Sequence, residues 1–583
     1  MNLWIVGARA DPRFCTNHGE SGLCSLVAKQ LFDSNMRKLI ATFFLILILA
    51  MSRFVSAGEV SGIVSAASPE ASRVGAEVLS RGGNAIDAAV ATSLALTVSE
   101  PAGSGIGGQT VMLIQLVDQA PFVIHGTTWS PRKLPRNISR GQLTSGRTAS
   151  TVPSTLKVLS LAHRRYGSHQ VSWSELVKPA ITLANKGVEI GPFRHRAFRF
   201  YGSALKDQKA AASIFLKRGQ KTYQVGDKIK QPLLAKTLKR IAKEGAEDFY
   251  TGKIAAEIVD DMAKNGGWIT AADLANFPEP KIVAPLMAEY RGYEVVTLPP
   301  PFGGWVVLQI LNIMEQSNIA VDQDNAARRA QLIEAMAIGH GTRKNDPVKS
   351  FTRYADNVAN KVSDDTAKRL LELYREEAGV EQEGDESGET THFTIADGLG
   401  NVVSVTQSID SYFGSKVAHP KLGFLYNNYM QSFRLQDDGS PYVIKENEMP
   451  LSSMSATIVK RDGKPVLALG SPGSARIISS VAQVTSHWID IENDIEKAVN
   501  AYRVHAVPPV SAYIEGPKIE NSLLQALGKA GMQLRRPAYG VSDSHYDPYF
   551  GGVHAIAWEK GAWRGAADPR RDGVVTIAET ITE

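Results

Sequence analysis

The sequence contains little cysteine and no recognisable metal-binding histidine pattern. Only two of its 583 residues are cysteines, Cys15 and Cys24, and both lie within the first 35 positions. The chain downstream therefore has neither a disulfide framework nor a thiol that could act as nucleophile or metal ligand. The twelve histidines include no H-E-x-x-H pair. We expect no metal site and no cofactor.

A strong excess of charge of either sign is also missing. The formal net charge is +5, and the first 57 residues contribute more than half of it, because 58 basic and 56 acidic residues follow them. Such a balance does not provide the basic surface that nucleic acids or anionic membranes require. We therefore expect a small-molecule partner and neither a nucleic acid nor a membrane.

One long apolar run is present, near the N-terminus. Two basic residues precede the apolar residues 39–51, and small residues follow them. This order is typical of a secretory signal peptide, and the run is too short to cross a bilayer comfortably. We assign residues 36–57 as the signal peptide and residues 1–35 as an over-called start or an extension. The mature protein would then begin near Gly58, in a periplasmic or secreted location.

An abrupt change of pattern marks the middle of the chain. Residues 381–389 are acidic and glycine-containing with almost no apolar side chain, which predicts an exposed, flexible loop. Residues 390–396 and 402–408 are alternating and rich in β-branched side chains, and a short turn with Asp and Gly joins them, which predicts a β-hairpin. In a hairpin centred on that turn, Ser408 lies opposite Thr390, so that a hydroxyl faces a hydroxyl.

A strand that begins with threonine after such a loop fits a self-cleaving enzyme. In this mechanism the Thr390 hydroxyl oxygen attacks the carbonyl carbon of Glu389, and hydrolysis of the resulting ester leaves Thr390 as a new N-terminal residue. Its free α-amine, with an ordinary pKa of about 7.7–8, can then take the proton from the hydroxyl of the same residue. The alternative is an ordinary loop that enters a hairpin without any chemistry.

Hydrophobic periodicity elsewhere indicates only a mixed α and β protein. A G-x-G-x-x-G pattern occurs at Gly103, Gly105 and Gly108, but a helix precedes it and a strand follows it, which is the reverse of a dinucleotide-binding site. We therefore predict a tight backbone loop without a cofactor. The predicted helices are 69–79, 85–98, 155–166, 173–186, 305–315 and 474–490. The predicted strands outside the hairpin are 63–66, 110–116, one that ends at Tyr426, 455–460 and 466–469.

Short motifs in the second half give the chain a resemblance to a known family. The motifs are Thr390-Thr391-His392, Asp397…Gly400-Asn401, Tyr426-Asn427-Asn428, Pro450-Leu451-Ser452-Ser453-Met454-Ser455 and Gly470-Ser471-Pro472-Gly473. In order and spacing they resemble the small-subunit motifs of the gamma-glutamyltransferase (gamma-glutamyltranspeptidase) family of N-terminal-nucleophile hydrolases, and the likeness covers nearly the whole chain from about Gly58. The resemblance implies an α+β fold, a four-layer αββα sandwich, divided by autoprocessing into a large subunit 58–389 and a small subunit 390–583.

The resemblance also implies which residues perform the chemistry. Thr390 would be both nucleophile and base, and autocleavage would separate it from Glu389. Ser408 occupies the place where the family usually has a threonine that supports the nucleophile. Gly473 and Ser474, in a glycine-rich connection between a strand and a helix, would be the oxyanion-hole donors. Without the resemblance, this connection would be interpreted as a simple turn.

The pocket for the acyl group departs from the family pattern. Ser452 and Ser453 match a serine pair that contacts the substrate carboxylate. Thr127 stands where the family has an arginine for the carboxylate of a γ-glutamyl group, and Ser432 replaces the acidic residue for its amine. Losing these charge-assisted contacts should cost about 1.5–3 kcal/mol each. Asp410 stands where the family typically has asparagine.

These departures leave three functional hypotheses. Trp129 and Tyr429 predict a more aromatic and less charged pocket, so the first hypothesis is hydrolysis or acyl transfer on an amide whose acyl group is not a zwitterionic γ-glutamyl group. The second is a genuine glutathione hydrolase and transpeptidase whose charges come from unmatched positions such as Arg132 or Arg434. The third is a protein that keeps the fold for binding only, although the retained hydroxyl groups argue against it.

Overall fold

The computed structural model describes residues 60–317, 325–376, 388–507, 511–537 and 545–579. The chain divides into the units Met1–Gly58 and Glu59–Glu583, and all described residues belong to the second. The predicted signal peptide and most of the acidic stretch 381–389 lie outside the described residues. In the described part of the chain, no helix combines the length and the apolar character needed to cross a membrane.

Two large sheets form the centre of the fold, and every neighbouring pair of strands in them is antiparallel. The first sheet contains, in order across it, β18 (Val574–Glu579), β1 (Val60–Ala66), β9 (Thr391–Asp397), β10 (Val402–Ser408), β2 (Gln109–Gln115), β3 (Phe122–His125) and β6 (Lys281–Val283). The second contains β17 (Ala562–Ala567), β16 (His554–Glu559), β12 (Lys464–Gly470), β11 (Thr457–Arg461), β8 (Tyr293–Thr297) and β7 (Leu286–Tyr290). Two small sheets consist of β13 (Val504–Val507), β14 (Ser511–Ile514) and β15 (Gln533–Arg535), and of β4 (Val188–Glu189) and β5 (Lys228–Ile229).

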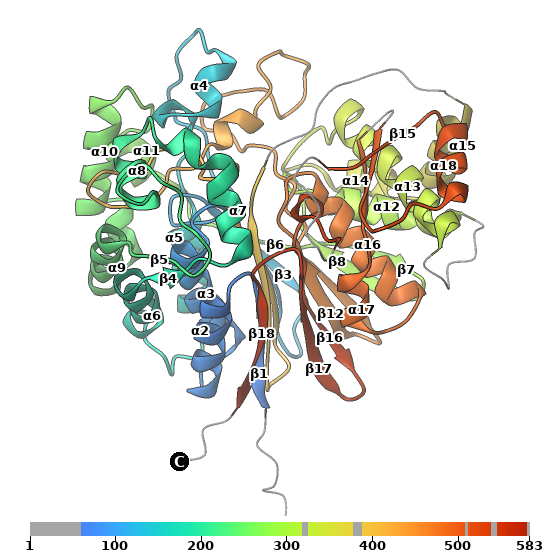
Figure 1. Cartoon of the computed structure of the whole chain (residues 1–583), viewed down its shortest axis with the longest axis horizontal. Coiled ribbons are helices and arrows are strands. Elements are labelled where there is room, and N and C mark those ends of the chain that lie inside the picture. The colour runs from blue at the N-terminus through green and yellow to red at the C-terminus, as the bar shows by residue number, and fades with distance from the viewer. Residues whose placement is uncertain (1–59, 318–324, 377–387, 508–510, 538–544, 580–583) are drawn as a thin grey trace, which may run out of the picture. The chain divides into compact units, whose positions relative to one another are not determined.

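Helices cover the outer faces of both large sheets (Figure 1). On the first sheet lie α2 (Pro69–Ser80), α3 (Ala85–Ser99) and α5 (Thr155–Tyr166), and on the second lie α12 (Gly304–Gln316), α16 (Arg476–Asp490) and α17 (Ile495–Asn500). The other α-helices in the described part of the chain are α4 (Arg140–Thr144), α6 (Trp173–Lys186), α7 (Pro192–Tyr201), α8 (Lys209–Phe215), α9 (Pro232–Glu244), α10 (Lys253–Lys264), α11 (Ala271–Ala275), α13 (Ala326–Asn345), α14 (Ala355–Lys361), α15 (Asp364–Glu376) and α18 (Asn521–Lys529).

The two sheets pack face to face through a separate apolar core. Fully buried side chains such as Leu113 and Val402 from the first sheet meet Ile458 and Ile556 from the second. Burying each aliphatic side chain of this size stabilises the fold by about 1.5–3 kcal/mol. Helix, sheet, sheet and helix therefore follow one another, which confirms the predicted four-layer αββα sandwich.

The hairpin at the centre of the first sheet has the predicted register. Thr391 pairs with Gln407, and the pairing continues to the turn. Every residue of β9 and β10 is buried, because helix α3 covers one face of these strands and the second sheet covers the other. Asp397 closes the turn by accepting from the N–H groups of Leu399 and Asn401, and it also accepts from the N–H of Ala85, the first residue of α3.

Two predictions of local structure are wrong. The segment that ends at Tyr426 is not a strand but one arm of an irregular hairpin with one isolated bridge, between Ala418 and Leu425. The Tyr426 carbonyl accepts from the N–H of Ser415 in the other arm, and the Leu425 carbonyl abuts Gly107, so this arm does not join either large sheet. The end of the predicted exposed loop is buried, since Glu389 is only 2% exposed. The cause is an ion pair with a distant arginine.

Candidate active site

Thr390 directly precedes β9 and lies in a chain of hydrogen-bonded hydroxyl groups. Its side chain is buried, and its Oγ1 donates to Ser408 Oγ at 3.2 Å. Ser408 Oγ in turn donates to the carbonyl oxygen of Glu389 at 2.8 Å and accepts from the backbone N–H of Asp410 at 2.8 Å. The Ser408 hydroxyl therefore contacts both the predicted nucleophile and the peptide bond that this nucleophile is predicted to attack.

The side chain of Glu389 forms the ion pair that buries the end of the acidic stretch. Arg571 donates from Nη1 to Glu389 Oε1 at 2.6 Å and from Nη2 to Oε2 at 3.1 Å, and both side chains are almost fully buried. Burial alone would lower the pKa of Arg571, but the neighbouring Glu389 carboxylate raises it above its usual value. Glu389 Oε1 also accepts from the N–H of Thr390 at 3.0 Å. This bidentate pair holds the residue before Thr390 in one position.

The glycine-rich loop after α3 lies directly behind these residues. A Cβ atom added at Gly103 would lie 3.1 Å from the carbonyl oxygen of Thr390 and 3.3 Å from Cγ of Glu389. One added at Gly108 would collide with the carbonyl oxygen of Ser408. Because only hydrogen fits at such distances, the glycines allow the backbone to support the nucleophile closely. The loop is thus the tight backbone turn that the sequence predicts.

The connection between β12 and α16 reaches the same place. Gly473 and Ser474 have φ angles of +117° and +55°, which is unusual for a serine. Ser474 lies against Gly388, because a Cβ atom on that glycine would be 2.8 Å from Ser474 Cβ. Backbone N–H groups at the start of a helix carry partial positive charge, so this turn can attract a developing oxyanion.

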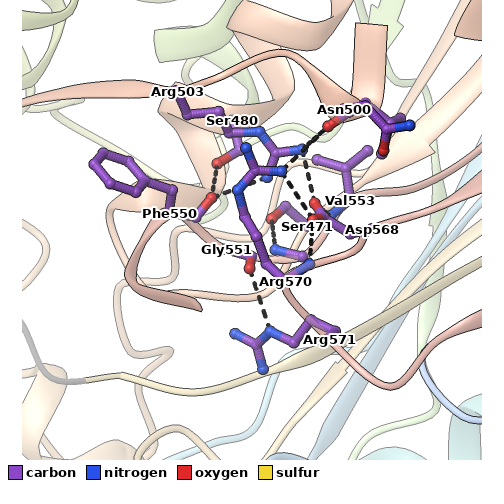
Figure 2. A network of polar contacts seen from close by, with 12 residues as sticks. Ser471, Ser480, Asn500, Arg503, Phe550, Gly551, Val553, Asp568, Arg570 and Arg571 are labelled. Atoms are coloured by element: carbon purple, nitrogen blue, oxygen red, sulfur yellow. Dashed lines mark hydrogen bonds and ion pairs between the residues drawn. The ribbon is translucent and has the colours of Figure 1, made fainter. Parts of the chain in front are cut away.

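A buried network of arginines supports that connection (Figure 2). Ser471 Oγ accepts a hydrogen bond from the backbone N–H of Gly552, in the turn 548–553, at 3.1 Å. Arg503 Nη1 donates to the carbonyl oxygen of Phe550 in the same turn at 3.0 Å. Asp568 pairs with Arg503 at 2.7 Å and with Arg570 at 3.0 Å. Burial would raise the pKa of Asp568, but the two guanidinium groups lower it below its usual range. These ion pairs and hydrogen bonds hold the turn 548–553 against the connection between β12 and α16.

His392 belongs to the same sequence motif as Thr390 but does not face this site. Its Nδ1 lies 2.9 Å from Thr406 Oγ1, and its ring fills the space next to Gly470. Burial lowers its pKa well below the usual value, so that the ring is uncharged. His392 therefore serves to pack β9 against β12.

A cavity of about 400 Å³ brings most of the predicted site residues together. Ser408 and Gly473 are not part of the cavity wall, but each adjoins a residue that is. Ser408 Oγ accepts a hydrogen bond from Thr390, and Gly473 directly precedes Ser474 in the chain. The predicted residues in its wall are Thr390, Asp410, Tyr429, Ser432, Ser452, Ser453 and Ser474.

Thr127 and Trp129 are predicted pocket residues that the structure places elsewhere. Both line a different cavity, of about 470 Å³, together with Arg132. Thr127 Oγ1 donates to Gln109 Oε1 at 3.3 Å, and Gln109 Nε2 donates to Ser452 Oγ at 3.4 Å. Thr127 thus connects to the Thr390 cavity only through the side chain of Gln109.

Asp410 and Ser432 lie side by side in the cavity wall. Ser432 Oγ donates to Asp410 Oδ2 at 3.4 Å, and Gln431 Nε2 donates to the same oxygen at 2.9 Å. A carboxylate is therefore present next to the position where the sequence predicts that an acidic residue has been lost. Asp410 follows the end of β10 and Ser432 ends a short 3₁₀ helix, so the folded structure brings together two side chains that are 22 positions apart in the chain.

The comparisons with known proteins agree with this geometry. A family model described as gamma-glutamyltranspeptidase matches residues 71–578. The chain belongs to this family. A glutathione hydrolase proenzyme from Pseudomonas sp. (strain A14) is 34% identical over 553 residues, which cover 88% of this chain and 94% of that protein. An acylase ACY 1 proenzyme from Pseudomonas sp. (strain SE83) is 34% identical over 535 residues, covering 88% and 92%.

The solved structures give the same result for the fold of this gamma-glutamyltranspeptidase family member. The crystal structure of cephalosporin acylase from Bacillus halodurans matches with a TM-score of 0.78 at 26% identity, covering 89% of this chain and 96% of that chain. Members of the family are N-terminal-nucleophile amide hydrolases and acyltransferases, so this chain is an enzyme of that class. Among the described residues, no group of His, Cys, Asp and Glu side chains is arranged to hold a metal ion.

The wall of the Thr390 cavity contains further residues that the sequence analysis did not predict. His340 and Arg343 come from α13, and His505 comes from β13. Ser479 Oγ lies 2.8 Å from His340 Nε2 and 2.8 Å from His505 Nδ1. Burial lowers the pKa of His340 to about 3, so that this wall is uncharged at the histidines at neutral pH. No local motif marks these residues, because they belong to separate segments.

A buried carboxyl group next to the Glu389 ion pair gives a pH-dependent prediction. Burial raises the pKa of Glu100 to about 8, although Arg571 and Arg194 oppose this. The folded state therefore holds a proton that the unfolded state loses near pH 4.5. The contribution of this proton to the free energy of unfolding should be fully present below pH 4.5. It should fall as the pH rises towards 8, by at most about 1.4 kcal/mol per pH unit.

A Glu100→Gln variant should remove this dependence. Its melting temperature should match that of the parent chain at pH 4 and exceed it at pH 8, because an amide cannot ionise. The uncut Thr390→Ala chain is the suitable background, since cleavage then does not change the charges nearby. An identical pH profile for both chains would show that Glu100 is ionised in the folded state.

Proposed function

We propose that this chain is an autoprocessed amide hydrolase that forms an acyl-enzyme on Thr390. The observation that carries the proposal is the position of Ser408, whose hydroxyl contacts both Thr390 Oγ1 and the Glu389 carbonyl oxygen. A loop that merely entered a hairpin would have no need to bury a glutamate and to place the Ser408 hydroxyl between its carbonyl oxygen and the Thr390 hydroxyl. We take Glu389–Thr390 as the bond that is cut.

In the processing step, Thr390 Oγ1 bonds to the carbonyl carbon of Glu389. Its proton passes to Ser408 Oγ while the Ser408 proton passes to the carbonyl oxygen, so that the tetrahedral intermediate is neutral. That proton moves on to the nitrogen as the C–N bond breaks, which leaves an ester and a free amine. Water then hydrolyses the ester to a Glu389 carboxylate and a threonine hydroxyl, dividing the chain into subunits 58–389 and 390–583.

In the catalytic cycle, the new α-amine of Thr390 is the general base. It takes the Oγ1 proton as Oγ1 attacks the substrate amide, and then gives it to the leaving amine. The N–H groups of Gly473 and Ser474 would stabilise the oxyanion, a contribution typically worth about 10²–10³ in rate per donor. Ser452 and Ser453 lie in the same cavity wall and would contact the acyl group. Water releases the acyl group and regenerates the enzyme.

We propose further that the acyl group is not the zwitterionic γ-glutamyl group. Thr127 carries no charge and lies outside the cavity wall, Ser432 carries only a hydroxyl, and the aromatic Tyr429 is part of the wall. Relatives named as acylases are about as similar to the chain as those named as glutathione hydrolases. An acylase acting on a less charged acyl group fits both facts.

One observation favours a second candidate, a genuine glutathione hydrolase. The Asp410 carboxylate, 3.4 Å from Ser432 Oγ, could hold a substrate amine from the neighbouring position. A comparison of γ-glutamyl 4-nitroanilide with glutaryl 4-nitroanilide separates the two candidates, because these substrates differ only in the α-amine. The acylase proposal expects glutaryl turnover at least equal to γ-glutamyl turnover. A γ-glutamyl preference of about tenfold or more, worth about 1.4 kcal/mol, would favour the glutathione hydrolase.

Replacing Ser408 tests the processing step. Ser408→Ala removes the hydroxyl that contacts the Glu389 carbonyl, so self-cleavage should slow by about 10²–10³-fold, the usual effect of losing one such donor. Ser408→Thr keeps the hydroxyl and should still cleave. Intact-mass measurements over time on freshly purified protein give both rates. Cleavage of Ser408→Ala at the parent rate would contradict the proposed proton path.

We also propose that the enzyme is exported to the periplasm or secreted. The support is the order of basic, apolar and small residues within 36–57. Residues 1–35 then have no part in the mature enzyme.

A further inference from the structure

Arg343 is a buried cation in the wall of the Thr390 cavity. It lies in the last turn of α13, its side chain lines the cavity, and only 8% of the residue is exposed. Its Nε atom is buried, and no hydrogen-bond acceptor among the described residues contacts it. No ion pair to Arg343 occurs in the described part of the chain.

The other basic residues in this wall are already engaged or exposed. Arg140 donates from Nη1 to the carbonyl groups of Gln431 and Phe433 at 3.0 and 3.1 Å. Arg434 pairs with Asp438, and Lys344 is exposed to solvent. Arg343 is therefore the cation of this wall that a ligand would find both buried and unpaired.

An unpaired guanidinium in a buried position is unfavourable unless something completes it. The nearby carbonyl ends of α13 stabilise a positive charge but do not supply the two coplanar oxygen atoms that match a guanidinium. The neighbouring His340 and His505 are uncharged because burial lowers their pKa values. The only carboxylate among the described residues of the wall, Asp410, is already bonded to Gln431 and Ser432.

We propose that Arg343 binds a carboxylate group of the substrate. The substrate class is then an amide that carries a carboxylate either on its acyl group or on its amine. This inference rests on the proposed amide hydrolysis at Thr390, because it places substrate in the same cavity. It gives the site a cation from the large-subunit region, on a helix unrelated to Thr127, Arg132 or Arg434.

The test compares Arg343→Gln with the parent enzyme on three anilides. Pentanoyl 4-nitroanilide carries no carboxylate, glutaryl 4-nitroanilide carries one on the acyl group, and the pentanoyl amide of 5-amino-2-nitrobenzoate carries one on the amine. The parent enzyme should prefer one carboxylated substrate over the neutral one by about 10–100-fold in kcat/KM, as expected for a charge-assisted contact. Arg343→Gln should reduce this preference to within about threefold of unity.

Matched variants separate binding from other effects. Lys344→Gln removes an exposed cation one residue further along the same helix and should keep the preference, whereas Arg343→Lys should keep part of it. Loss of the glutaryl preference places the carboxylate on the acyl group, and loss of the nitrobenzoate preference places it on the amine. The inference is overturned if Arg343→Gln leaves the substrate preference unchanged. This includes the case in which the substitution lowers the melting temperature and has no other effect.

A binding measurement keeps this inference separate from the proposed function. If the processed parent enzyme turns over none of the anilides, the hydrolase proposal fails in its present form. Free glutarate should nevertheless raise the melting temperature of the parent protein and not that of Arg343→Gln, because a ligand that binds only the folded state stabilises it. Equal shifts in the two proteins would overturn the role of Arg343 regardless of activity.

Discussion

A Thr390→Ala chain should remain a single uncut polypeptide without amidase activity. The parent chain should instead give two fragments that meet between Glu389 and Thr390. The reason is that alanine lacks the Oγ that attacks the Glu389 carbonyl and later the substrate, and removing a nucleophile typically lowers kcat by about 10⁴–10⁶-fold. Intact-mass analysis and a 4-nitroanilide assay on the same preparations measure both effects.

Thr390→Ser is the matched control for this experiment. It keeps a hydroxyl at the same atom, so it should still cleave and still turn over substrate, although at different rates. If the parent chain itself stays uncut and inactive, the resemblance preserves only the fold, and the search should turn to binding partners. Cleavage in Thr390→Ala would place the nucleophile at another residue.

An Arg571→Met variant should unfold at markedly lower denaturant concentration. It leaves the Glu389 carboxylate buried without its partner, and breaking a buried ion pair in this way costs about 3–5 kcal/mol. The measurement is urea unfolding of Arg571→Met in the uncut Thr390→Ala background, because a cut chain does not unfold in a simple two-state manner. In the cleavable chain the same substitution should also slow processing, since Glu389 loses the contact that fixes its carbonyl.

A double-mutant cycle with Glu389→Gln isolates this contact. Removing both charges should restore part of the stability that Arg571→Met loses, because no unpaired charge then remains. Strictly additive effects of the two substitutions would mean that the pair makes no net interaction. In that case the buried position of Glu389 would depend on its backbone alone.

Local patterns in the sequence predict the helices and the central hairpin well. The helices at 155–166 and 173–186 have the predicted bounds, since amphipathic spacing and end signals are properties of consecutive residues. The pairing of Thr391 with Gln407 likewise follows from the strands and the turn between them. The four-layer arrangement came from the family resemblance, since periodicity alone indicated only a mixed protein.

The contents of the site depend on contacts that consecutive residues cannot reveal. Glu389 looks like the end of an exposed acidic loop until Arg571, 182 positions away, pairs with it. Arg343 carries no motif and enters the cavity only because α13 packs behind it. The family resemblance predicts Thr127 as a pocket residue, yet Gln109 separates it from the Thr390 cavity. In each case a side chain from a distant segment decides the role.

The order of strands in the first sheet has a consequence for the lifetime of the enzyme. Strand β1, from the region before the proposed cut, lies between β18 and β9, which both come after it. Neither fragment could leave without breaking hydrogen bonds along a central strand. The cut chain would therefore persist because separation is slow, yet once separated its halves would have to meet again as two molecules. The two subunits would therefore reach their native arrangement by folding as one intact precursor, and subunits separated after the cut would not readily associate again.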